Sequence, residues 1–384
     1  MAKSTTPTSA PSLLVSPAGR WQLKRYPLRT NDPLQAWDAA DELLHQHIAA
    51  DVTALEATHQ PLVLNDQWGA LLLPFAHCQV TTVNDSFVSQ QGQLANLALN
   101  QLSTELTQLD PLATLPQATE SVWLKIPKSQ SLLEFQLAKL SSELQPGTPL
   151  RAAAKSKLFT PAVRELFAKY CDEVDISLIQ RKCRVLTARV RSVPLNTEHF
   201  MSKWQLTEHN LTLHHHVGVF ARNQLDIGAR LLLDNLPEPG ASEVIDLGCG
   251  NGVLGLVYAQ SSPSSAVTWV DESHLAVASC RLNIEQNLAT TPSYRAVTDD
   301  CLSQFTSHSV DLVLCNPPFH QEHAITEHIA RQMFRDAKRV LRKGGEMRLV
   351  ANRHLPYYHP LKRLFKQVKQ VASNAKFVVY SCLT

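Results

Sequence analysis

The C-terminal half of the chain alternates short apolar runs with longer segments of helical periodicity. The run from Val244 to Leu247 is followed by a glycine turn and an apolar segment of helical length, and a second run ends at Asp271. A third run ends at Cys315, and the helical pattern after it extends to Gly344. Apolar strands separated by helical segments predict a parallel, doubly wound α/β sheet.

Four polar residues stand at the carboxyl ends of the predicted strands: Asp246, Asp271, Asp300 and Asn316. Parallel strands place these ends along a single edge of the sheet, where open α/β folds bind ligands. The sequence therefore predicts a ligand site along this edge.

The third apolar run stops abruptly at Asn316, because Pro317 and Pro318 cannot donate hydrogen bonds to a sheet. A plain strand-to-helix turn explains such a stop as well as a functional site does. The functional interpretation is that the turn holds the Asn316 carboxamide and the ring of Phe319 rigidly at the ligand-binding edge.

The glycine turn spells G-x-G-x-x-G at Gly250, Gly252 and Gly255, a pattern that is weak by itself. Asp246 precedes these glycines. Its carboxylate would repel the pyrophosphate of a dinucleotide but attract a cofactor that carries an ammonium and a sulfonium, such as S-adenosyl-L-methionine. Asp271 follows the first glycine by about 20 residues, the spacing at which an acid accepts both ribose hydroxyls. The alternative for Asp271 is a helix N-cap.

Composition and charge limit the class of protein. The 384 residues have 44% hydrophobic content, enough for two globular domains, which we expect at residues 1–195 and 196–384. The formal net charge is only +2, but basic residues cluster at residues 181–191, 338–343 and 362–369. Each run is either a solvated face or part of a surface that binds phosphates.

Eight cysteines are scattered without a C-x-x-C pair, so we expect reduced thiols in a cytoplasmic protein rather than a disulfide framework or a zinc ribbon. No apolar run reaches the length of a membrane helix. The N-terminal residues are small and polar, which indicates a disordered tail and not a signal peptide. His209 and the tract from His214 to His216 invite a metal site, but no acidic or thiol partner stands at ligand spacing, so no metal is expected. We expect the tract to border the cofactor entrance instead.

Three motifs, VIDLGCGNGVLG, WVDES and NPPFH, resemble those of the class I methyltransferases. The Asn-Pro-Pro-aromatic form is typical of enzymes that methylate exocyclic amines. Further segments, among them GVFARNQLDIGARLLL and VANRHLPYYHPLK, resemble the bacterial ribosomal RNA guanine 2-amino methyltransferases. VANRHLPYYHPLK and the HHHVGVFAR context favour the large-subunit branch over the small-subunit branch. The resemblance implies S-adenosyl-L-methionine as cofactor and 23S ribosomal RNA as partner, with no membrane and no metal.

The same resemblance implies a set of site residues. The catalytic turn would comprise Asn316, Pro317, Pro318 and Phe319. VFARNQLDIG resembles a segment that closes over the cofactor, although core packing is an equal alternative for Phe220. Cofactor contacts are expected at Phe220, Arg222, Gly228, Asp246, Gly248, Cys249, Gly250, Asp271, Glu272, Asp300 and Asn316.

The N-terminal half is interpreted as a decayed repeat of the C-terminal half. LVLNDQWGALL stands where the glycine turn stands, and SVWLKIPKS stands where the Asn-Pro-Pro turn stands. The acid and the glycines are replaced by residues 65–68, and the Asn by Ile126 or its neighbour. We therefore expect a degenerate methyltransferase-like domain with a structural or RNA-binding role, to which Lys125, Lys128 and Lys155 supply charge.

The expected mechanism on a guanine amine needs no strong base. The side-chain oxygen of Asn316 and the backbone carbonyl of Pro317 would accept the two amine protons, and Phe319 would stack on the base. His320 would orient the base or the loop. The motifs alone leave guanine, adenine, cytosine and a glutamine amide open as acceptors. The alternatives are a small-subunit 16S enzyme, an adenine-N6 methyltransferase and a noncatalytic RNA-binding protein with this fold.

Overall fold

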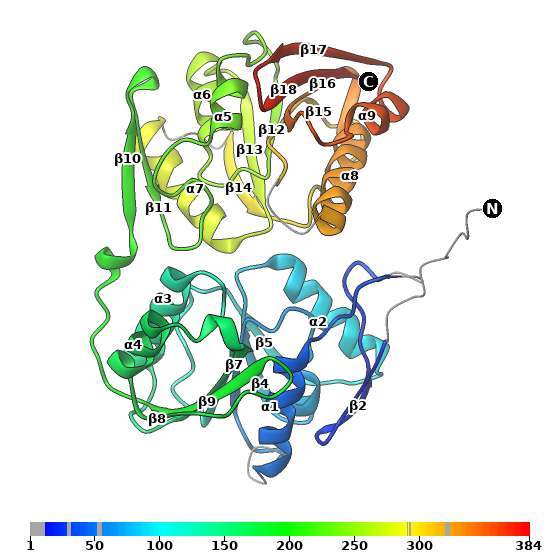
Figure 1. The fold of residues 1–384 in the computed structure, drawn as a ribbon. Coiled ribbons are helices and arrows are strands. Elements are labelled where there is room, and N and C mark those ends of the chain that lie inside the picture. The colour runs from blue at the N-terminus through cyan, green and yellow to red at the C-terminus, as the bar shows by residue number, and fades with distance from the viewer. Residues whose placement is uncertain (1–11, 29–31, 52–55, 290, 292, 319–322) are drawn as a thin grey trace, which may run out of the picture. The chain divides into compact units, whose positions relative to one another are not determined.

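The computed structural model describes residues 12–28, 32–51, 56–289, 291, 293–318 and 323–384 (Figure 1). The chain divides into two compact units, Met1–Phe200 and Met201–Thr384. The division lies slightly beyond the boundary expected at residue 195. Each unit contains one seven-stranded sheet with helices packed against it, which confirms the expected tandem α/β fold.

The sheet of the C-terminal unit has the strand order β14-β13-β12-β15-β16-β18-β17. The first five strands in this order are parallel, whereas β18 runs antiparallel to both β16 and β17. The chain order reverses between β12 and β15, and such a switch point is where open α/β sheets bind ligands. The strands are β12 (Glu243–Leu247), β13 (Ala266–Asp271), β14 (Tyr294–Thr298), β15 (Val310–Cys315), β16 (Leu341–Asn352), β17 (Gln367–Ser373) and β18 (Phe377–Leu383).

Helices cover both faces of this sheet, because its central strands are apolar on both sides. In β12, Val244 packs in the core beneath α5, α6 and α7, whereas Ile245 packs in the core beneath α8 and α9. Leu312 and Val313 of β15 divide between the two cores in the same way. The helices and the two strands of a separate ribbon are α5 (Ile227–Leu233), α6 (Val253–Ser261), α7 (His274–Asn287), α8 (His323–Val340), α9 (Tyr358–Leu364), β10 (Ser202–Leu206) and β11 (Leu211–His215).

The ribbon of β10 and β11 contacts α7 instead of joining the sheet. Asn283 on α7 accepts a hydrogen bond from the His214 N–H at 2.7 Å and donates to the His214 carbonyl at 3.0 Å. One turn further along the helix, Asn287 makes the same two bonds with Thr212 at 2.9 Å. These side chains satisfy backbone groups that an edge strand would otherwise leave unpaired.

The N-terminal unit repeats this architecture strand for strand. Its sheet order, β5-β4-β3-β6-β7-β9-β8, equals that of the C-terminal sheet when strands are matched in chain order, and a ribbon of β1 and β2 precedes it. The short 3-10 turn η2 stands where α6 stands in the other unit. The expected repeat is therefore confirmed. The elements are β1 (Leu13–Ser16), β2 (Gly19–Gln22), α1 (Ala39–Ala50), β3 (Pro61–Leu64), η2 (Leu73–Phe75), β4 (Gln79–Val83), α2 (Phe87–Leu99), β5 (Glu105–Leu109), β6 (Ser121–Lys125), α3 (Gln130–Glu143), β7 (Pro149–Lys155), α4 (Pro161–Tyr170), β8 (Cys171–Ile176) and β9 (Cys183–Val190).

The repeat extends to individual hydrogen bonds. Asn96 on α2 pairs with both the N–H and the carbonyl of Lys24, and Asn100, which caps that helix, pairs in the same way with Gln22. Helix α2 is the counterpart of α7 in chain order. Both helices therefore hold a ribbon through asparagines spaced four residues apart, which lie on one helix face.

One expected helix boundary is wrong. Helix α8 ends at Val340, well before Gly344, and β16 follows at once. The Val340 carbonyl accepts from the Ser309 N–H at 2.8 Å, and the Arg339 carbonyl accepts from the His308 N–H at 3.0 Å. The loop before β15 thus takes up the last helical carbonyl groups, which a search for a terminating glycine does not detect.

All eight cysteines are free, as expected. Within the described ranges, no helix is long and apolar enough to cross a membrane. The same part of the chain contains no group of three or more His, Cys, Asp or Glu side chains arranged to hold a metal ion.

Candidate cofactor and amine site

The loop after β12 turns tightly against the end of β13. The N–H groups of Gly248 and Cys249 both donate to the Val270 carbonyl, at 2.8 and 3.0 Å. Gly248 and Gly252 have left-handed backbone angles, with φ of 71° and 85°. A Cβ at Gly252 would lie 2.7 Å from Sγ of Cys280 on α7, so only glycine allows this close approach. The loop is therefore held between β13 and α7.

Asp246 lies in β12 beneath this loop and is completely buried. Its Oδ2 accepts a hydrogen bond from the Gly255 N–H at 2.8 Å, whereas its Oδ1 has no hydrogen-bond partner among the described residues. Burial raises the pKa of Asp246 to about 7, although the Gly255 bond opposes the shift. A buried carboxylate oxygen without a donor costs free energy unless a cation or donor reaches it. The arrangement therefore fits the ammonium of S-adenosyl-L-methionine.

Asp271 ties the glycine loop to the end of β13. Its Oδ2 accepts from the Gly250 N–H at 2.9 Å, and its Oδ1 accepts from the Ser273 N–H at 3.0 Å. Burial raises the pKa of Asp271. Ser273 itself caps α7 by accepting from the Ala276 N–H, so the N-cap alternative for Asp271 is wrong. Each carboxylate oxygen keeps a second lone pair, and the ribose contact stays a prediction.

Asp300 follows β14, and its Oδ1 accepts from Nε2 of Gln332 on α8 at 2.8 Å. Burial raises the pKa of Asp300. Cε of Met333, the next residue on α8, is 3.1 Å from where a Cβ on Gly248 would lie. Helix α8 therefore forms part of the wall around the loop. Sequence reasoning missed both residues of α8, because packing alone decides which helix face meets the loop.

Asn316 follows β15 on the other side of the switch point. Its Oδ1 is buried and has no hydrogen-bond partner among the described residues. Its backbone carbonyl lies 4.0 Å from the position of a Cβ on Gly248, so the Asn316 turn and the glycine loop are neighbours. Pro317 is buried and Pro318 half-buried. Phe319 and His320 lie outside the described residues.

Three expected cofactor contacts precede β12 in the chain, and they differ in burial and in partners. Phe220 is 56% exposed, so it is not a core residue. Nε of Arg222 donates to Oγ of Ser202 at 3.0 Å. Gly228 is buried in α5, and a Cβ there would lie 3.2 Å from the ring of Phe377. Close packing against this ring therefore explains the glycine without a cofactor. Cofactor contacts at these three positions stay predictions.

Two further expected contacts flank the loop. Cys249 is buried and lies beside Cys280, and burial raises the pKa of its thiol. Glu272, which directly follows Asp271, is exposed. Contacts of either residue with the cofactor also stay predictions.

The histidine tract, which we expected to border the cofactor entrance, supports the glycine loop through His215, a specific contact that sequence reasoning missed. His215 is completely buried, its ring stacks on Trp204 at 5.7 Å, and Nε2 lies 3.0 Å from Nδ2 of Asn251 in the glycine loop. Burial lowers the pKa of His215 to about 4, so the ring is neutral and its Nε2 can accept from the amide. Asn283 donates to the Asn251 carbonyl at 2.9 Å. The ribbon and α7 together hold this loop residue.

The counterpart of the site in the N-terminal unit has lost both oxygens. Matching the register of β3 with β6 to that of β12 with β15 puts Lys125 at the position of Asn316 and Val63 at that of Asp246. The expectation that one of residues 65–68 replaces the acid is therefore wrong. The sequence left open whether Ile126 or a neighbour replaces the Asn, and the strand register identifies that residue as Lys125.

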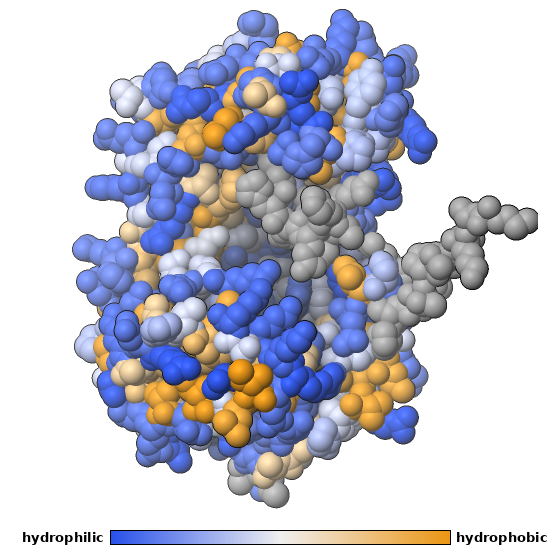
Figure 2. Space-filling view, in the orientation of Figure 1, coloured by the Kyte–Doolittle hydropathy of each residue, from blue (hydrophilic) through white to orange (hydrophobic). Residues whose placement is uncertain are grey.

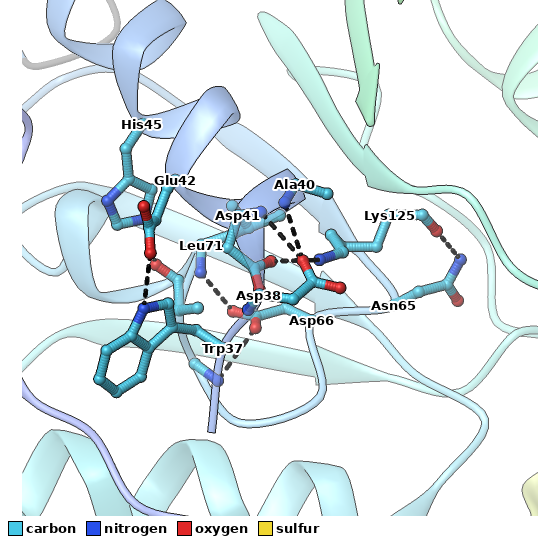
Figure 3. A network of polar contacts seen from close by, with 12 residues as sticks. Trp37, Asp38, Ala40, Asp41, Glu42, His45, Asn65, Asp66, Leu71 and Lys125 are labelled. Atoms are coloured by element: carbon cyan, nitrogen blue, oxygen red, sulfur yellow. Dashed lines mark hydrogen bonds and ion pairs between the residues drawn. The ribbon is translucent and has the colours of Figure 1, made fainter. Parts of the chain in front are cut away.

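Lys125 is ion-paired within the N-terminal unit (Figure 3). Its Nζ lies 2.6 Å from Oδ1 of Asp38 and 2.7 Å from Oδ1 of Asp41. Although burial opposes the shift, the two carboxylates raise the pKa of Lys125. The expectation that Lys125 supplies free charge to RNA is wrong, whereas Lys128 and Lys155 are exposed.

Ion pairs also engage two of the three basic runs. In the run at residues 181–191, three arginines bind carboxylates of the same unit, and in the run at 338–343 two do so. The pairs are Arg181 with Glu42, Arg189 with Glu173, Arg191 with Asp172, Arg339 with Asp336 and Arg342 with Asp311. Phosphates would have to compete with these carboxylates.

The chain matches two described protein families, Methyltransferase small domain over residues 210–381 and RLMG N-terminal domain over residues 12–192. Ribosomal RNA large subunit methyltransferase G of Aeromonas salmonicida (strain A449) is 46% identical over 368 residues, which cover 95% of this chain and 97% of the relative. The protein of the same name from Vibrio vulnificus (strain YJ016) is 42% identical and covers 93% of this chain and 95% of its own length.

A solved structure, T. thermophilus 16S rRNA N2 G1207 methyltransferase (RsmC) in complex with AdoMet and guanosine, has the same fold. The TM-score is 0.75, the identity is 24%, and 97% of each chain is covered. We assign the family of this chain from the relatives that are more than 40% identical to it, because they match over nearly their whole length. The chain belongs to the family of ribosomal RNA large subunit methyltransferase G.

Proposed function

We propose that the chain transfers a methyl group from S-adenosyl-L-methionine to the exocyclic 2-amino group of a specific guanine in 23S ribosomal RNA. One observation carries the proposal: Oδ1 of Asp246 and Oδ1 of Asn316 are buried and without partners among the described residues, on the two strands that flank the switch point. The first oxygen suits a cationic cofactor, and the second suits a planar amine.

The choice of nucleic acid and of base rests on relatives. Proteins 42–46% identical to this chain are named for the large ribosomal subunit. The T. thermophilus enzyme, named for the N2 position of a guanine in 16S rRNA, was solved with guanosine. We transfer the guanine amine from this class of enzyme, and the large-subunit RNA from the more similar relatives.

The chemistry requires orientation of the amine more than removal of a proton. S-adenosyl-L-methionine supplies an electrophilic methyl group. The lone pair of the guanine 2-amino nitrogen is delocalised into the ring, which makes the amine a poor nucleophile. Oδ1 of Asn316 and the backbone carbonyl of Pro317 accept hydrogen bonds from the two N–H groups of the amine, which keeps both protons, and direct its lone pair out of the ring plane. The proton is lost to solvent after transfer, because the methylated amine is strongly acidic.

Base pairing limits which guanine can react. The 2-amino group takes part in the pair with cytosine, so the target must be unpaired or flipped out of its helix before Asn316 can reach it. This requirement fits a large folded RNA, which contains unpaired guanines. Flipping the guanine out also requires that protein surfaces outside the amine site hold the RNA in a deformed conformation.

We assign the N-terminal unit a structural or RNA-binding role. The ion pairs of Lys125 with Asp38 and Asp41 stand where the C-terminal unit has its amine site, which supports a degenerate domain without cofactor. Exposed Lys128 and Lys155 remain available to phosphates. An rRNA substrate also supports a cytoplasmic location, which we propose for the activity.

A noncatalytic RNA-binding protein with this fold is the alternative of another class. This alternative does not explain why the oxygens of Asp246 and Asn316 are buried without partners among the described residues, since each such oxygen costs about 1–3 kcal/mol of stability. A small-subunit guanine or an adenine N6 atom as acceptor remains an outcome that the assay can detect.

The test is transfer of labelled methyl groups to 23S and 16S rRNA from cells that lack the protein, followed by nucleoside analysis. The proposal expects N2-methylguanosine in 23S rRNA alone. Label in 16S rRNA or in N6-methyladenosine would contradict the assigned substrate, and no label in either RNA would contradict the assigned activity.

A further inference from the structure

The C-terminal end of the chain is rich in basic residues, of which Arg348 is ion-paired with Glu346. Residues 347–384 contain seven Lys and Arg residues and no Asp or Glu. Part of this segment lies at the ligand-binding edge, because β16 is parallel to β15 and adjacent to it. The residues that follow Asn352 therefore emerge about 5 Å, one strand spacing, to the side of the strand that ends before Asn316.

Four exposed residues of this segment form what we call the basic ledge: Arg353, Tyr358, Lys362 and Lys376. The Arg353 N–H donates to the Lys376 carbonyl at 2.9 Å, which joins the ends of β16 and β18. On α9, Nζ of Lys362 lies 5.2 Å from the centroid of the Tyr358 ring. The tyrosine thus holds the ammonium by a cation–π contact without neutralising its charge.

The cations of the ledge differ from those of the other basic runs. Five arginines of the runs at residues 181–191 and 338–343 bind carboxylates, whereas the ion pairs among the described residues include none of Arg353, Lys362 and Lys376. Arg353 donates to a backbone carbonyl, that of Asn374, at 3.1 Å. Figure 2 shows mostly hydrophilic residues over the region of α9. Cations without carboxylate partners are the ones that phosphates engage at least cost.

We propose that the basic ledge binds phosphates of the rRNA strand that flanks the target nucleotide. The inference rests on the proposed function and adds to it a surface of the catalytic unit. A base extruded toward Asn316 brings its own backbone to the same sheet edge, since neighbouring phosphates are covalently tied to it. The ledge thereby fixes the strand while the Asn316 turn holds the amine.

The experiment compares two variants of the full-length protein that each lose two positive charges. Lys362→Gln/Lys376→Gln alters the ledge, and Lys343→Gln/Lys366→Gln alters two exposed lysines near the amino ends of β16 and β17, at the opposite edge. RNA affinity is measured with 23S rRNA fragments over a series of salt concentrations. The ledge variant should bind about tenfold more weakly at low salt, and the slope of log K against log salt should fall by about 1 to 2. The control variant should keep the wild-type affinity and slope.

Further measurements separate the causes of each result. Both variants should bind S-adenosyl-L-methionine with wild-type affinity, and Lys362→Arg/Lys376→Arg should keep RNA affinity because the charge remains. Equal loss in the ledge and control variants, or loss in the Arg variant, overturns the ledge. If the wild-type protein transfers methyl groups and the ledge variant binds RNA normally, only the ledge is overturned. A wild-type protein that methylates no rRNA overturns the proposed function instead, and the ledge with it.

Discussion

We assign Asp246 and Asn316 different tasks at the two strand ends that flank the switch point. One is a buried acid beneath a glycine loop, and the other is a neutral amide in front of two prolines. Both were predictable, because a polar residue at the end of an apolar strand is a local pattern. Gln332 and His215 were not predictable, because their contacts with the site depend on how α8 and the ribbon pack.

Replacing Asn316 with Ala should lower turnover by about 10² to 10³, the usual cost of losing one preorganised catalytic dipole, while the fold and cofactor affinity stay nearly intact. Asn316→Asp should keep more activity than Asn316→Ala, because a carboxylate still accepts an amine proton. Single-turnover methyl transfer to rRNA measures the effect. Normal turnover of Asn316→Ala would remove the residue from the mechanism.

The raised pKa of Asp246 leads us to expect that cofactor binding depends on pH. In the free protein its carboxyl keeps its proton up to about pH 7, whereas in the unfolded chain it ionises near the ordinary value of 3.8. The folded state thus binds more protons between these values, so the contribution of this group to stability is full below about pH 4 and declines as pH rises toward about 7. A cationic ligand instead favours the ionised form.

Affinity for S-adenosyl-L-methionine should therefore rise between about pH 6 and about pH 8, and Asp246→Asn should flatten that rise. Calorimetric titrations at several pH values measure both. A wild-type affinity that does not change over this range would argue against a contact between Asp246 and a cationic group.

At the scale of elements, the glycine loop depends on neighbours that are distant in sequence. Strand β13 accepts two of its N–H groups, and α7 and the ribbon hold Asn251. The order of strands and helices was predictable from hydrophobic periodicity. The end of α8 at Val340 was not, because its last carbonyl groups bind the loop before β15. Long-range pairing of this kind leaves no local signal.

Asn283 and Asn287 provide a matched pair of tests on α7. Asn283→Ala leaves the backbone groups of His214 and the Asn251 carbonyl without partners, which should cost about 1–3 kcal/mol for each group that stays buried. It should also weaken S-adenosyl-L-methionine binding, because Asn251 belongs to the loop.

Asn287→Ala loses bonds to Thr212 but none to the loop. It should therefore lower stability without changing cofactor affinity. Urea unfolding and calorimetry measure the two effects. Equal cofactor affinity in both variants would show that Asn283 does not position the loop.

At the scale of the whole molecule, two units of one topology differ in chemistry. The shared strand order and the paired asparagines indicate a common architecture, while Lys125 and Val63 stand where Asn316 and Asp246 stand. The decayed repeat was predictable from weak internal similarity. The ion pairs of Lys125 were not, because Asp38 and Asp41 come from a helix that lies far away in sequence.

Residues 201–384 produced alone should bind S-adenosyl-L-methionine but bind 23S rRNA more weakly than the full chain. All cofactor candidates lie in this unit, whereas the degenerate unit retains exposed lysines without a site of its own. Calorimetry and a salt-dependent RNA-binding assay measure the two affinities. Full rRNA affinity of the isolated unit would contradict the RNA-binding role of the N-terminal unit.

Nucleoside mapping of ribosomal RNA from cells that lack the gene tests the central claim most directly. We expect 23S rRNA from these cells to lack one N2-methylguanosine, and a plasmid copy of the wild-type gene to restore it while an Asn316→Ala copy, at equal protein level, restores little. Unchanged 23S rRNA in the deletion strain, or full restoration by Asn316→Ala, would contradict the account.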